Sequence, residues 1–314
     1  MKDIRIIFMG TPDFAMTILK HLVENKYTIV GVITAADKPA GRGRKLNESA
    51  VKKYALSQNL TVLQPTNLKN EEFHKELKSL KADLQIVVAF RMLPKVVWQM
   101  PQFGTFNLHA SLLPAYRGAA PIHWAIINGE TKTGVTTFFI DDKIDTGEVI
   151  LQEEIAIANE ETVGSLHDKL MVLGADLVAK TINLIAEGDT ITKKQPELEE
   201  KSAPKLHPEN TKINWFDSIE TIHNKIRGLN PFPAAWTIIF NDGIEVFTKI
   251  YAVKKEEEEH QHTIGQIITS KKEIKVAVNN GFIIINELKL AGKKRMNTKS
   301  LLNGFTFSEN SKML

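Results

Sequence analysis

The sequence contains no cysteine among its 314 residues. This absence excludes disulfide cross-links, thiolate metal sites and a thiol nucleophile, so catalysis must depend on other groups. No apolar run is long enough to span a bilayer and no cleavable apolar leader is present, which predicts a cytoplasmic protein without membrane contact. The turn at residues 8–14 has one glycine, Gly10, where a dinucleotide cradle needs Gly-x-Gly-x-x-Gly. Its absence argues against a nicotinamide- or flavin-dependent oxidoreductase.

The chain also lacks a strong charge of one sign, because its formal net charge is only +3. Its positive charge is gathered locally. Residues 34–53 carry six basic side chains against two acidic ones, and residues 289–299 carry five basic side chains and no acidic one. Each segment is compatible with a solvated surface or with a polyanion site, and charge alone leaves both interpretations open.

The composition is otherwise globular, 43% hydrophobic and 25% charged, with enough residues for two domains. In the first half, amphipathic helical segments at 13–26 and 165–186 accompany strand-like runs at residues 4–9, 28–34, 61–63, 84–90, 104–109 and 135–140. This alternation predicts an α/β fold with a Rossmann-like, doubly wound and mostly parallel sheet. Ligands of such sheets bind beyond the carboxyl ends of the strands, so Phe90, His109 and Asp141 lie where function is expected.

The second half has a different texture. Polar and proline-containing residues 189–207 predict a linker between a catalytic domain at residues 1–188 and a second domain at 208–314. The second domain has short strand-like runs at residues 235–240, 245–253, 265–269, 274–278 and 282–290. Two turns of the Asn/Asp-Gly type join them, which predicts a small OB-like β-barrel. The charged residues 254–259 are predicted to form a solvated, mobile loop.

A polar pair lies at the end of one predicted strand. Side chains alternate along a strand, so Asn107 and His109 point to one face, away from Phe106 and Leu108. An amide donor beside an imidazole suits acyl transfer, which needs a hydrogen bond to an oxyanion and a group that moves protons. Taken alone, the pair is better explained by a buried histidine that satisfies a hydrogen bond and an asparagine that caps a turn.

The surrounding residues carry a family resemblance. Residues 107–118, Asn-Leu-His-Ala-Ser-Leu-Leu-Pro-Ala-Tyr-Arg-Gly, and the aspartate loop at 141–147, Asp-Asp-Lys-Ile-Asp-Thr-Gly, together resemble the signature of the folate-dependent formyltransferases. The resemblance implies that Asn107 holds the formyl oxygen and His109 moves the proton. It also implies that Asp145 orients the imidazole or stabilises its charge, as an aspartate beside a histidine does.

The same resemblance implies a formyl donor, 10-formyltetrahydrofolate, used as a co-substrate, and no metal. The folate is expected beyond two strand ends and along the turn after His109. The residues expected to contact it are Phe90, Arg91, Met92, Leu93, Ser111, Leu112, Leu113, Pro114, Ile140, Asp141 and Asp142.

For the acceptor, the chain resembles the methionyl-tRNA formyltransferases over residues 4–302, including residues 10–14, 38–45 and 118–122. This branch of the family implies a monomer that formylates initiator methionyl-tRNA for translation initiation. The expected tRNA contacts are Arg42, Arg44, Lys45, Lys289, Lys293, Lys294 and Arg295. Two other functions stay open: formyl transfer to a sugar-nucleotide amine, and hydrolysis of formyl-folate.

Overall fold

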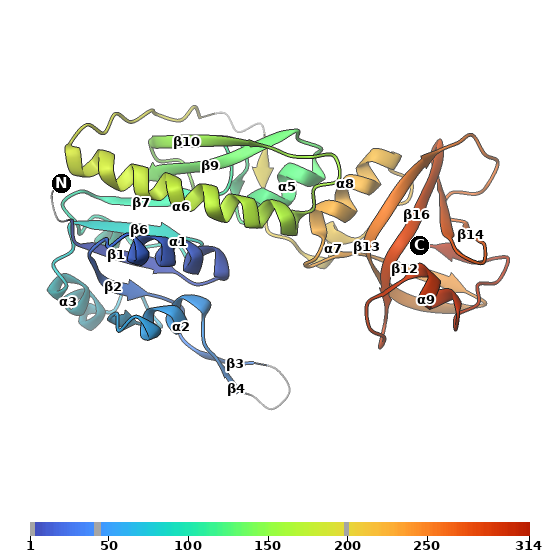
Figure 1. The fold of residues 1–314 in the computed structure, drawn as a ribbon, viewed down its shortest axis with the longest axis horizontal. Coiled ribbons are helices and arrows are strands. Elements are labelled where there is room, and N and C mark those ends of the chain that lie inside the picture. Colours follow the sequence, from blue (N-terminus) through green and yellow to red (C-terminus); the bar gives the residue numbers. More distant parts are fainter. Residues whose placement is uncertain (1–3, 41–44, 198–200) are drawn as a thin grey trace. The chain divides into compact units, whose positions relative to one another are not determined.

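The computed structural model describes residues 4–40, 45–197 and 201–314, drawn as a coloured ribbon in Figure 1. The chain forms two compact units. Unit 1 consists of residues 1–118, 134–155 and 167–202, and unit 2 consists of residues 119–133, 156–166 and 203–314. Each unit is therefore assembled from three separate stretches of the sequence.

The main sheet of unit 1 has seven strands among the described residues, in the order β10-β9-β7-β6-β1-β2-β5. Its strands are β1 (Ile6–Gly10), β2 (Ile29–Ile33), β5 (Val62–Leu63), β6 (Leu84–Val88), β7 (Thr105–His109), β9 (Lys132–Phe139) and β10 (Val149–Ala156). The five strands from β7 to β5 run parallel, whereas β9 is antiparallel to β7. The predicted Rossmann-like, mostly parallel sheet is confirmed.

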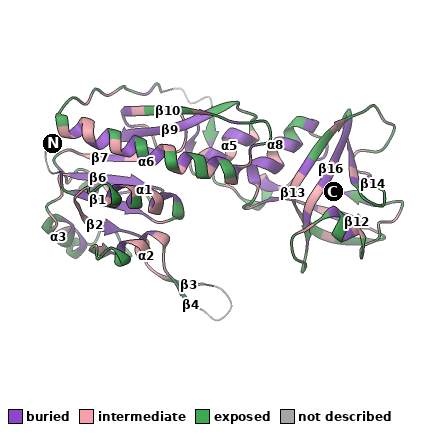
Figure 2. Cartoon of the chain, viewed as in Figure 1, coloured by how far each residue is buried: buried purple, intermediate pink, exposed green. Residues whose placement is uncertain are grey.

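Helices accompany these strands: α1 (Asp13–Glu24), α2 (Ala50–Ser57), α3 (Glu71–Ser79), α4 (Lys95–Trp98) and α6 (Val163–Glu187). Both faces of the central strands are covered, so β1 and β6 are buried along their whole length while the outer sides of the helices are exposed (Figure 2). Gly174 of α6 lies directly on Leu108, where an added Cβ would come within 2.8 Å of the leucine side chain. Leu108 therefore points towards α6, and its neighbours Asn107 and His109 point to the opposite face of β7.

Two short strand pairs complete unit 1. The first is a hairpin of β3 (Lys38–Ala40) and β4 (Lys45–Asn47). The second joins β8 (Arg117–Gly118) to β11 (Ser202–Ala203).

Unit 2 is an antiparallel barrel. Its strands are β12 (Ala235–Asn241), β13 (Ile244–Glu257), β14 (Ile267–Thr269), β15 (Ile274–Val278), β16 (Gly281–Leu290), β17 (Met296–Asn297) and β18 (Lys312–Met313). They pair in the order β14-β15-β16-β13-β12-β18, with β17 on β16. A further antiparallel bridge between Gln266 and Lys312 links the two ends of this order, which nearly closes the barrel. The predicted small β-barrel is confirmed.

Four helices among the described residues belong to unit 2: α5 (Pro121–Ile127), α7 (Pro208–Thr211), α8 (Ile219–Leu229) and α9 (Thr298–Leu302). The apolar side of α8, with Ile222 and Ile226, packs into the barrel core beside Ile250 and Ile285. Ser218 begins α8 by accepting a hydrogen bond from the backbone nitrogen of Thr221, which satisfies a donor that a helix start leaves free.

One expectation for unit 2 is wrong. Residues 254–257 form the end of β13 and pair with residues 281–284, so they are strand rather than mobile loop. Their charges are accommodated by ion pairs from neighbouring elements: Lys255 pairs with Glu220, and Glu256 pairs with Lys275. The hydrogen bond from Lys275 lowers the pKa of the Glu256 carboxyl below its usual value. In a sequence, a run of charged residues is typical of a loop. In a strand, the same side chains alternate between two faces, and each face can form ion pairs with neighbouring elements.

The segment predicted as a linker, residues 189–207, has structure of its own. Lys193 forms an antiparallel β-bridge with Val149, and Gln195 is buried. A strand that sequence reasoning did not predict, β10, lies at the sheet edge with alternating exposed residues. Within the described residues, no helix combines the length and apolar character needed to cross a membrane.

Candidate active site

Strand β7 places two polar side chains on one face at its carboxyl end. His109 is buried, and Asn107 is partly buried. The Oδ1 atom of Asn107 is buried and has no hydrogen-bond partner among the described residues. A buried acceptor left without a donor costs about 1–3 kcal/mol, and such atoms are rare in folded proteins. An N–H donor from a bound substrate can satisfy this oxygen.

The His109 ring is fixed by one backbone contact. Its Nε2 atom lies 2.8 Å from the carbonyl oxygen of Tyr116. A carbonyl oxygen only accepts, so Nε2 carries the hydrogen and donates it. This leaves Nδ1 as the ring nitrogen that can take and release a proton. Nδ1 lies 3.7 Å from Oδ2 of Asp145, which is too long for a direct hydrogen bond but close enough for charge attraction when the ring is protonated.

Asp145 is held in an uncommon backbone conformation. Its φ angle is 55°, in the left-handed region that costs a residue other than glycine about 1 kcal/mol or more. Its carboxylate Oδ2 accepts a hydrogen bond of 2.9 Å from the backbone nitrogen of Gly118. The start of the same loop is closed by Asp141, which accepts bonds from the backbone of Lys143 and the hydroxyl of Thr146. The loop is therefore shaped to present one carboxylate to His109.

The end of this loop requires a glycine. A Cβ atom on Gly147 would lie 1.6 Å from the carbonyl oxygen of Phe139, far inside van der Waals contact. Only glycine lets the backbone pass this close to β9.

Gln195, which sequence reasoning did not assign to the site, connects the aspartate loop to Arg117. Gln195 donates from Nε2 to the carbonyl oxygens of Asp145, at 3.1 Å, and Gly147, at 2.7 Å. Its Oε1 accepts two hydrogen bonds from the guanidinium of Arg117. Gln195 lies in the polar segment read as a linker, and no periodicity or motif of that segment marks it out.

The turn after His109 is fixed by side chains from β9 and β10. Thr136 donates its hydroxyl to the carbonyl oxygen of Ser111 and accepts from the backbone nitrogen of Leu113. Gln152 donates to the carbonyl oxygen of Leu113. Ser111 and Leu113 are buried, Leu112 and Pro114 partly so, and the Leu113-Pro114 peptide bond is cis. This turn forms a rigid wall beside His109.

The other residues expected to contact folate differ in their surroundings. Leu93 is buried in a core cluster, against which Phe90 and Ile140 pack in part. Met92 is exposed, with 67% of its surface accessible. Arg91 donates to the carbonyl oxygens of Pro65 and Thr66, and exposed Asp142 pairs with Lys95 at 3.6 Å. Phe90 follows β6, as expected. Ile140 follows β9, which runs antiparallel to β7, so it leaves the sheet beside Thr105 and not beside His109. Leu93 packs in the core.

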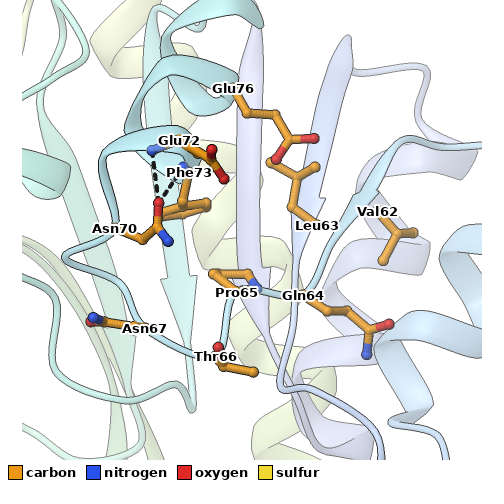
Figure 3. A pocket seen from close by; sticks show the side chains of 10 residues that line it. All are labelled: Val62, Leu63, Gln64, Pro65, Thr66, Asn67, Asn70, Glu72, Phe73 and Glu76. Carbon is orange, nitrogen blue, oxygen red and sulfur yellow. Dashed lines mark hydrogen bonds between the residues drawn. The ribbon is translucent and has the colours of Figure 1, made fainter.

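A separate hollow of about 360 Å³ lies beside β5 and the start of α3 (Figure 3). Its lining residues are Val62, Leu63, Gln64, Pro65, Thr66, Asn67, Asn70, Glu72, Phe73 and Glu76. The amide oxygen of Asn70 is occupied there, because it caps α3 by accepting from the backbone nitrogens of Glu72 and Phe73. None of the predicted site residues lines this hollow itself, although Arg91 is hydrogen-bonded to the backbone of two lining residues, Pro65 and Thr66.

Of the expected tRNA contacts, Arg42 and Arg44 lie outside the described residues, and Lys45 is the first residue of β4. The base of this hairpin is anchored by Asp37, which accepts hydrogen bonds from Lys52 and Gln64. The bond from Lys52 lowers the pKa of the Asp37 carboxyl. The start of the β3–β4 hairpin is therefore fixed to the rest of unit 1.

The remaining expected tRNA contacts lie on unit 2. Lys289, on β16, is exposed, as are Lys293, Lys294 and Arg295 after it. Arg295 already forms a double hydrogen bond with Glu287 and lies 4.2 Å from the centre of the Tyr251 ring. Within the described part of the chain, no group of three histidine, aspartate or glutamate residues is placed to hold a metal ion.

Comparison with known proteins gives matches along most of the chain. Residues 4–182 match the family described as Formyl transferase, and residues 205–306 match the family described as Formyl transferase, C-terminal domain. The chain is 61% identical over 314 residues, the full length of both, to a protein of Flavobacterium johnsoniae named methionyl-tRNA formyltransferase. It is 52% identical over 318 residues, 99% of each chain, to a protein of Bacteroides thetaiotaomicron with the same name.

Among solved structures, the chain is similar to an N-formyltransferase from Helicobacter canadensis in complex with folinic acid and dTDP-3-aminofucose. The TM-score is 0.67 with 22% sequence identity, over 93% of this chain and 100% of that one. At this identity the likeness shows a shared fold that extends through both units.

Proposed function

The chain belongs to the formyl transferase family, and we propose that it transfers a formyl group to the amino group of methionyl-tRNA. One observation carries the proposal. The relatives of that name match this chain over its whole length, at 61% and 52% identity, and so include both units. With an initiator tRNA as acceptor, the product is N-formylmethionyl-tRNA, and the reaction belongs to the cytoplasm, where translation starts.

For the donor, we infer 10-formyltetrahydrofolate. The similar structure from Helicobacter canadensis holds folinic acid, a folate derivative. In this chain, Phe90 and Ile140 pack in part against the same apolar cluster and offer apolar surface for a flat pterin ring. Ser111 to Pro114 then form the wall near the reacting carbon, with Asp141 and Asp142 at the start of the opposite loop.

The reaction needs no covalent enzyme intermediate. The amine nitrogen attacks the formyl carbon and forms the new carbon–nitrogen bond, and the bond from that carbon to the folate nitrogen then breaks. The amine loses one proton and the folate nitrogen gains one. His109 is suited to this transfer, because Nε2 stays bonded to Tyr116 while Nδ1 can take and release the proton. Asp145 stabilises the positive charge that His109 carries between the two steps.

Asn107 has two tasks in this scheme. We infer that its Nδ2 donates to the formyl oxygen, on which negative charge develops during attack. Its Oδ1, which has no partner among the described residues, accepts an N–H from the attacking amine. A single side-chain amide then orients the nucleophile and stabilises the oxyanion.

The tRNA is expected to contact a mixed aromatic and basic surface on the barrel. Trp236 and Phe247 stack with ring centres 5.2 Å apart, and Lys212 lies 5.5 Å above the Trp236 ring. In the strand register, Lys249 is opposite Trp236 on one side and opposite Lys289 on the other. Rings that stack on bases next to cations that meet phosphates are typical of OB-type nucleic-acid surfaces.

This surface supports a division of labour in which residues 1–188 hold the folate and perform the chemistry, and residues 208–314 bind tRNA. Lys293 and Lys294 extend the cationic side of the surface beyond Lys289. Arg295 is the weakest candidate, because Glu287 already occupies its guanidinium. The hairpin residues Arg42, Arg44 and Lys45 are proposed to meet the acceptor stem, with a monomer as the acting species.

The test offers the purified chain labelled 10-formyltetrahydrofolate with methionyl-tRNA, with a sugar-nucleotide amine, or with buffer alone. We expect rapid formation of N-formylmethionyl-tRNA, slowed by added salt because phosphate contacts release counterions. Fast, salt-insensitive transfer to the sugar amine would replace the proposed acceptor. Equal release of formate in all three mixtures would make the protein a hydrolase.

A further inference from the structure

A buried glutamine links the aspartate loop to the strand that follows the His109 turn. Gln195 is 8% exposed. Its Oε1 accepts hydrogen bonds from Nε and Nη2 of Arg117, at 3.1 and 2.7 Å. Its Nε2 donates to the carbonyl oxygens of Asp145 and Gly147, at 3.1 and 2.7 Å. A side-chain amide has two donors and two acceptor positions, so the hydrogen-bonding capacity of Gln195 is fully used.

This arrangement defines the orientation of the amide. Arg117 has only donors, and the two carbonyl oxygens have only acceptor sites, so a flipped amide would face like groups on both sides. The Gln195 side chain is therefore hydrogen-bonded to two separate parts of the structure at once. One is Arg117, which is 8% exposed and also donates to the carbonyl oxygen of Pro196. The other is the backbone of the aspartate loop, at the carbonyl groups of Asp145 and Gly147.

The aspartate loop needs such support. Asp145 has a φ angle of 55°, and Gly147 passes directly beneath the carbonyl oxygen of Phe139. A residue kept in a costly conformation persists only when its surroundings hold it there. The carboxylate of Asp145 is held by Gly118, while its carbonyl oxygen is held by Gln195. The two contacts together determine where the carboxylate lies relative to His109.

Hydrogen bonds connect one short segment, residues 116–118, to both members of the proposed proton-transfer pair, His109 and Asp145. Tyr116 accepts the hydrogen bond of His109, Arg117 binds Gln195, and Gly118 binds Asp145. Three consecutive residues therefore position both members of the pair, and Gln195 connects the middle one to the aspartate loop.

We propose that Gln195 is a positioning residue for formyl transfer, which fixes the Asp145 carboxylate against Nδ1 of His109 through its two donor hydrogen bonds. The proposal rests on the proposed function of His109 and Asp145. It assigns a role in the chemistry to a residue outside both sequence motifs, in a segment whose composition predicts a linker. Gln195 itself touches no reacting atom, and its effect passes through the aspartate loop.

Two variants separate the donor role from packing. Gln195→Ala removes all four hydrogen bonds. Gln195→Glu keeps the shape and the acceptor for Arg117 but replaces the donors with an oxygen that repels the two carbonyl groups. We expect both to lower kcat for formyl transfer about 10- to 100-fold, the scale of a small misplacement at a reacting centre. The KM for the folate should change by less than about three-fold, since no folate contact is removed.

Three measurements distinguish positioning from a general structural effect. The pH–rate profile of both variants should change in the same way as that of Asp145→Asn. Adding Gln195→Ala to Asp145→Asn should cost less than about three-fold more, because the carboxylate to be positioned is already gone. Hydrogen exchange in peptides covering residues 141–147 should become faster in Gln195→Ala.

Gln85 provides a matched control. It is a buried glutamine of unit 1, 1% exposed, and its amide accepts a hydrogen bond from Thr105 near the amino end of β6. Gln85→Ala should lower thermal stability to a similar extent, with a kcat within about three-fold of wild type and an unchanged pH profile.

Several results would overturn the proposal. They are wild-type kcat and pH profile in folded Gln195→Ala, near-normal kcat in Gln195→Glu, or an equal rate loss on the Asp145→Asn background. If Gln195→Ala does not fold, Gln195→Glu, measured alone and combined with Asp145→Asn, decides the question. Wild-type protein that transfers no formyl group to methionyl-tRNA would refute the proposed function instead, so the two failures are distinguishable.

Discussion

Removal of the Asn107 amide should separate activity from stability. In the resting enzyme, Oδ1 of Asn107 is buried and has no partner among the described residues. We expect Asn107→Ala to depress formyl transfer about 100-fold or more, the usual effect of losing an oxyanion donor. The same change should not destabilise the protein. It removes a buried hydrogen-bond acceptor that has no donor, within the described part of the chain, to offset the cost of taking it out of water.

The size of the stability effect follows from two opposed contributions. An unsatisfied buried acceptor costs about 1–3 kcal/mol, which Asn107→Ala recovers. The lost packing of the amide group removes on the order of 1 kcal/mol. The free energy of unfolding of unit 1 should therefore lie between no change and a gain of about 2 kcal/mol. A polar residue retained at a cost in stability is typical of functional sites.

The control is a buried polar group with a satisfied hydrogen bond on the next strand. The hydroxyl of Thr137 lies 2.8 Å from that of Thr181, which itself donates to the carbonyl oxygen of Leu177. Thr137 is therefore the donor in its pair. Thr137→Val keeps the shape and should lower the free energy of unfolding by about 1 kcal/mol, with little change in formyl transfer. Thr137→Val should therefore lower stability, whereas Asn107→Ala should leave it unchanged or raise it.

The assay must follow unit 1 alone, because a chain with two compact units does not unfold in one step. Hydrogen exchange of peptides from β6 and β7 in increasing urea gives the local free energy of opening. Steady-state formyl transfer to methionyl-tRNA gives the activity. A folded Asn107→Ala protein with near-normal turnover, or one destabilised by more than about 1 kcal/mol, would refute the reasoning.

The remaining predictions concern the other parts of the site and the tRNA surface. His109→Ala should lower turnover about 100-fold or more in a folded protein, and normal turnover would remove it from proton transfer. Asp145→Asn should lower turnover with a changed pH profile; an unchanged profile would contradict its role beside His109. Lys289→Ala should flatten the dependence of log affinity for tRNA on log salt by about 0.7 to 0.9, without altering folate binding, and an unchanged slope would exclude a phosphate contact. Arg42→Ala should raise the KM or lower the turnover with methionyl-tRNA, without altering folate binding. An unchanged KM and turnover with tRNA would make the hairpin an ordinary solvated surface.

Most of the fold could be predicted from the sequence because its elements are locally consistent. The strands of unit 1 are apolar runs of the right length, and the Asn-Gly and Asp-Gly turns of unit 2 mark its hairpins. Strand β10 was missed because half of its side chains are exposed at the sheet edge. The end of β13 was misread because its charges find partners only in three dimensions, from Glu220 and Lys275.

The candidate site was predictable in part. Strand alternation places Asn107 and His109 on one face, and the family motif adds Asp145, whose carboxylate the structure brings to 3.7 Å from the ring. Their catalytic roles stay predictions. The contacts that hold them were not predictable, because Tyr116 acts through its backbone carbonyl and Gln195 comes from a polar segment 50 residues after Asp145. A backbone acceptor leaves no mark on the residue type.

The three-part assembly of each unit also determines the order in which the protein can be completed during synthesis. Helix α5 belongs to unit 2, and Ile127 at its end lies against Gly228 of α8. At about 5–20 residues per second, translation reaches α8 on the order of ten seconds after α5. During that interval Ile127, which packs against the cluster that includes the apolar side of α8 in the finished protein, has not yet met α8. The apolar contacts between α5 and α8 are therefore completed only when the last third of the chain has been made.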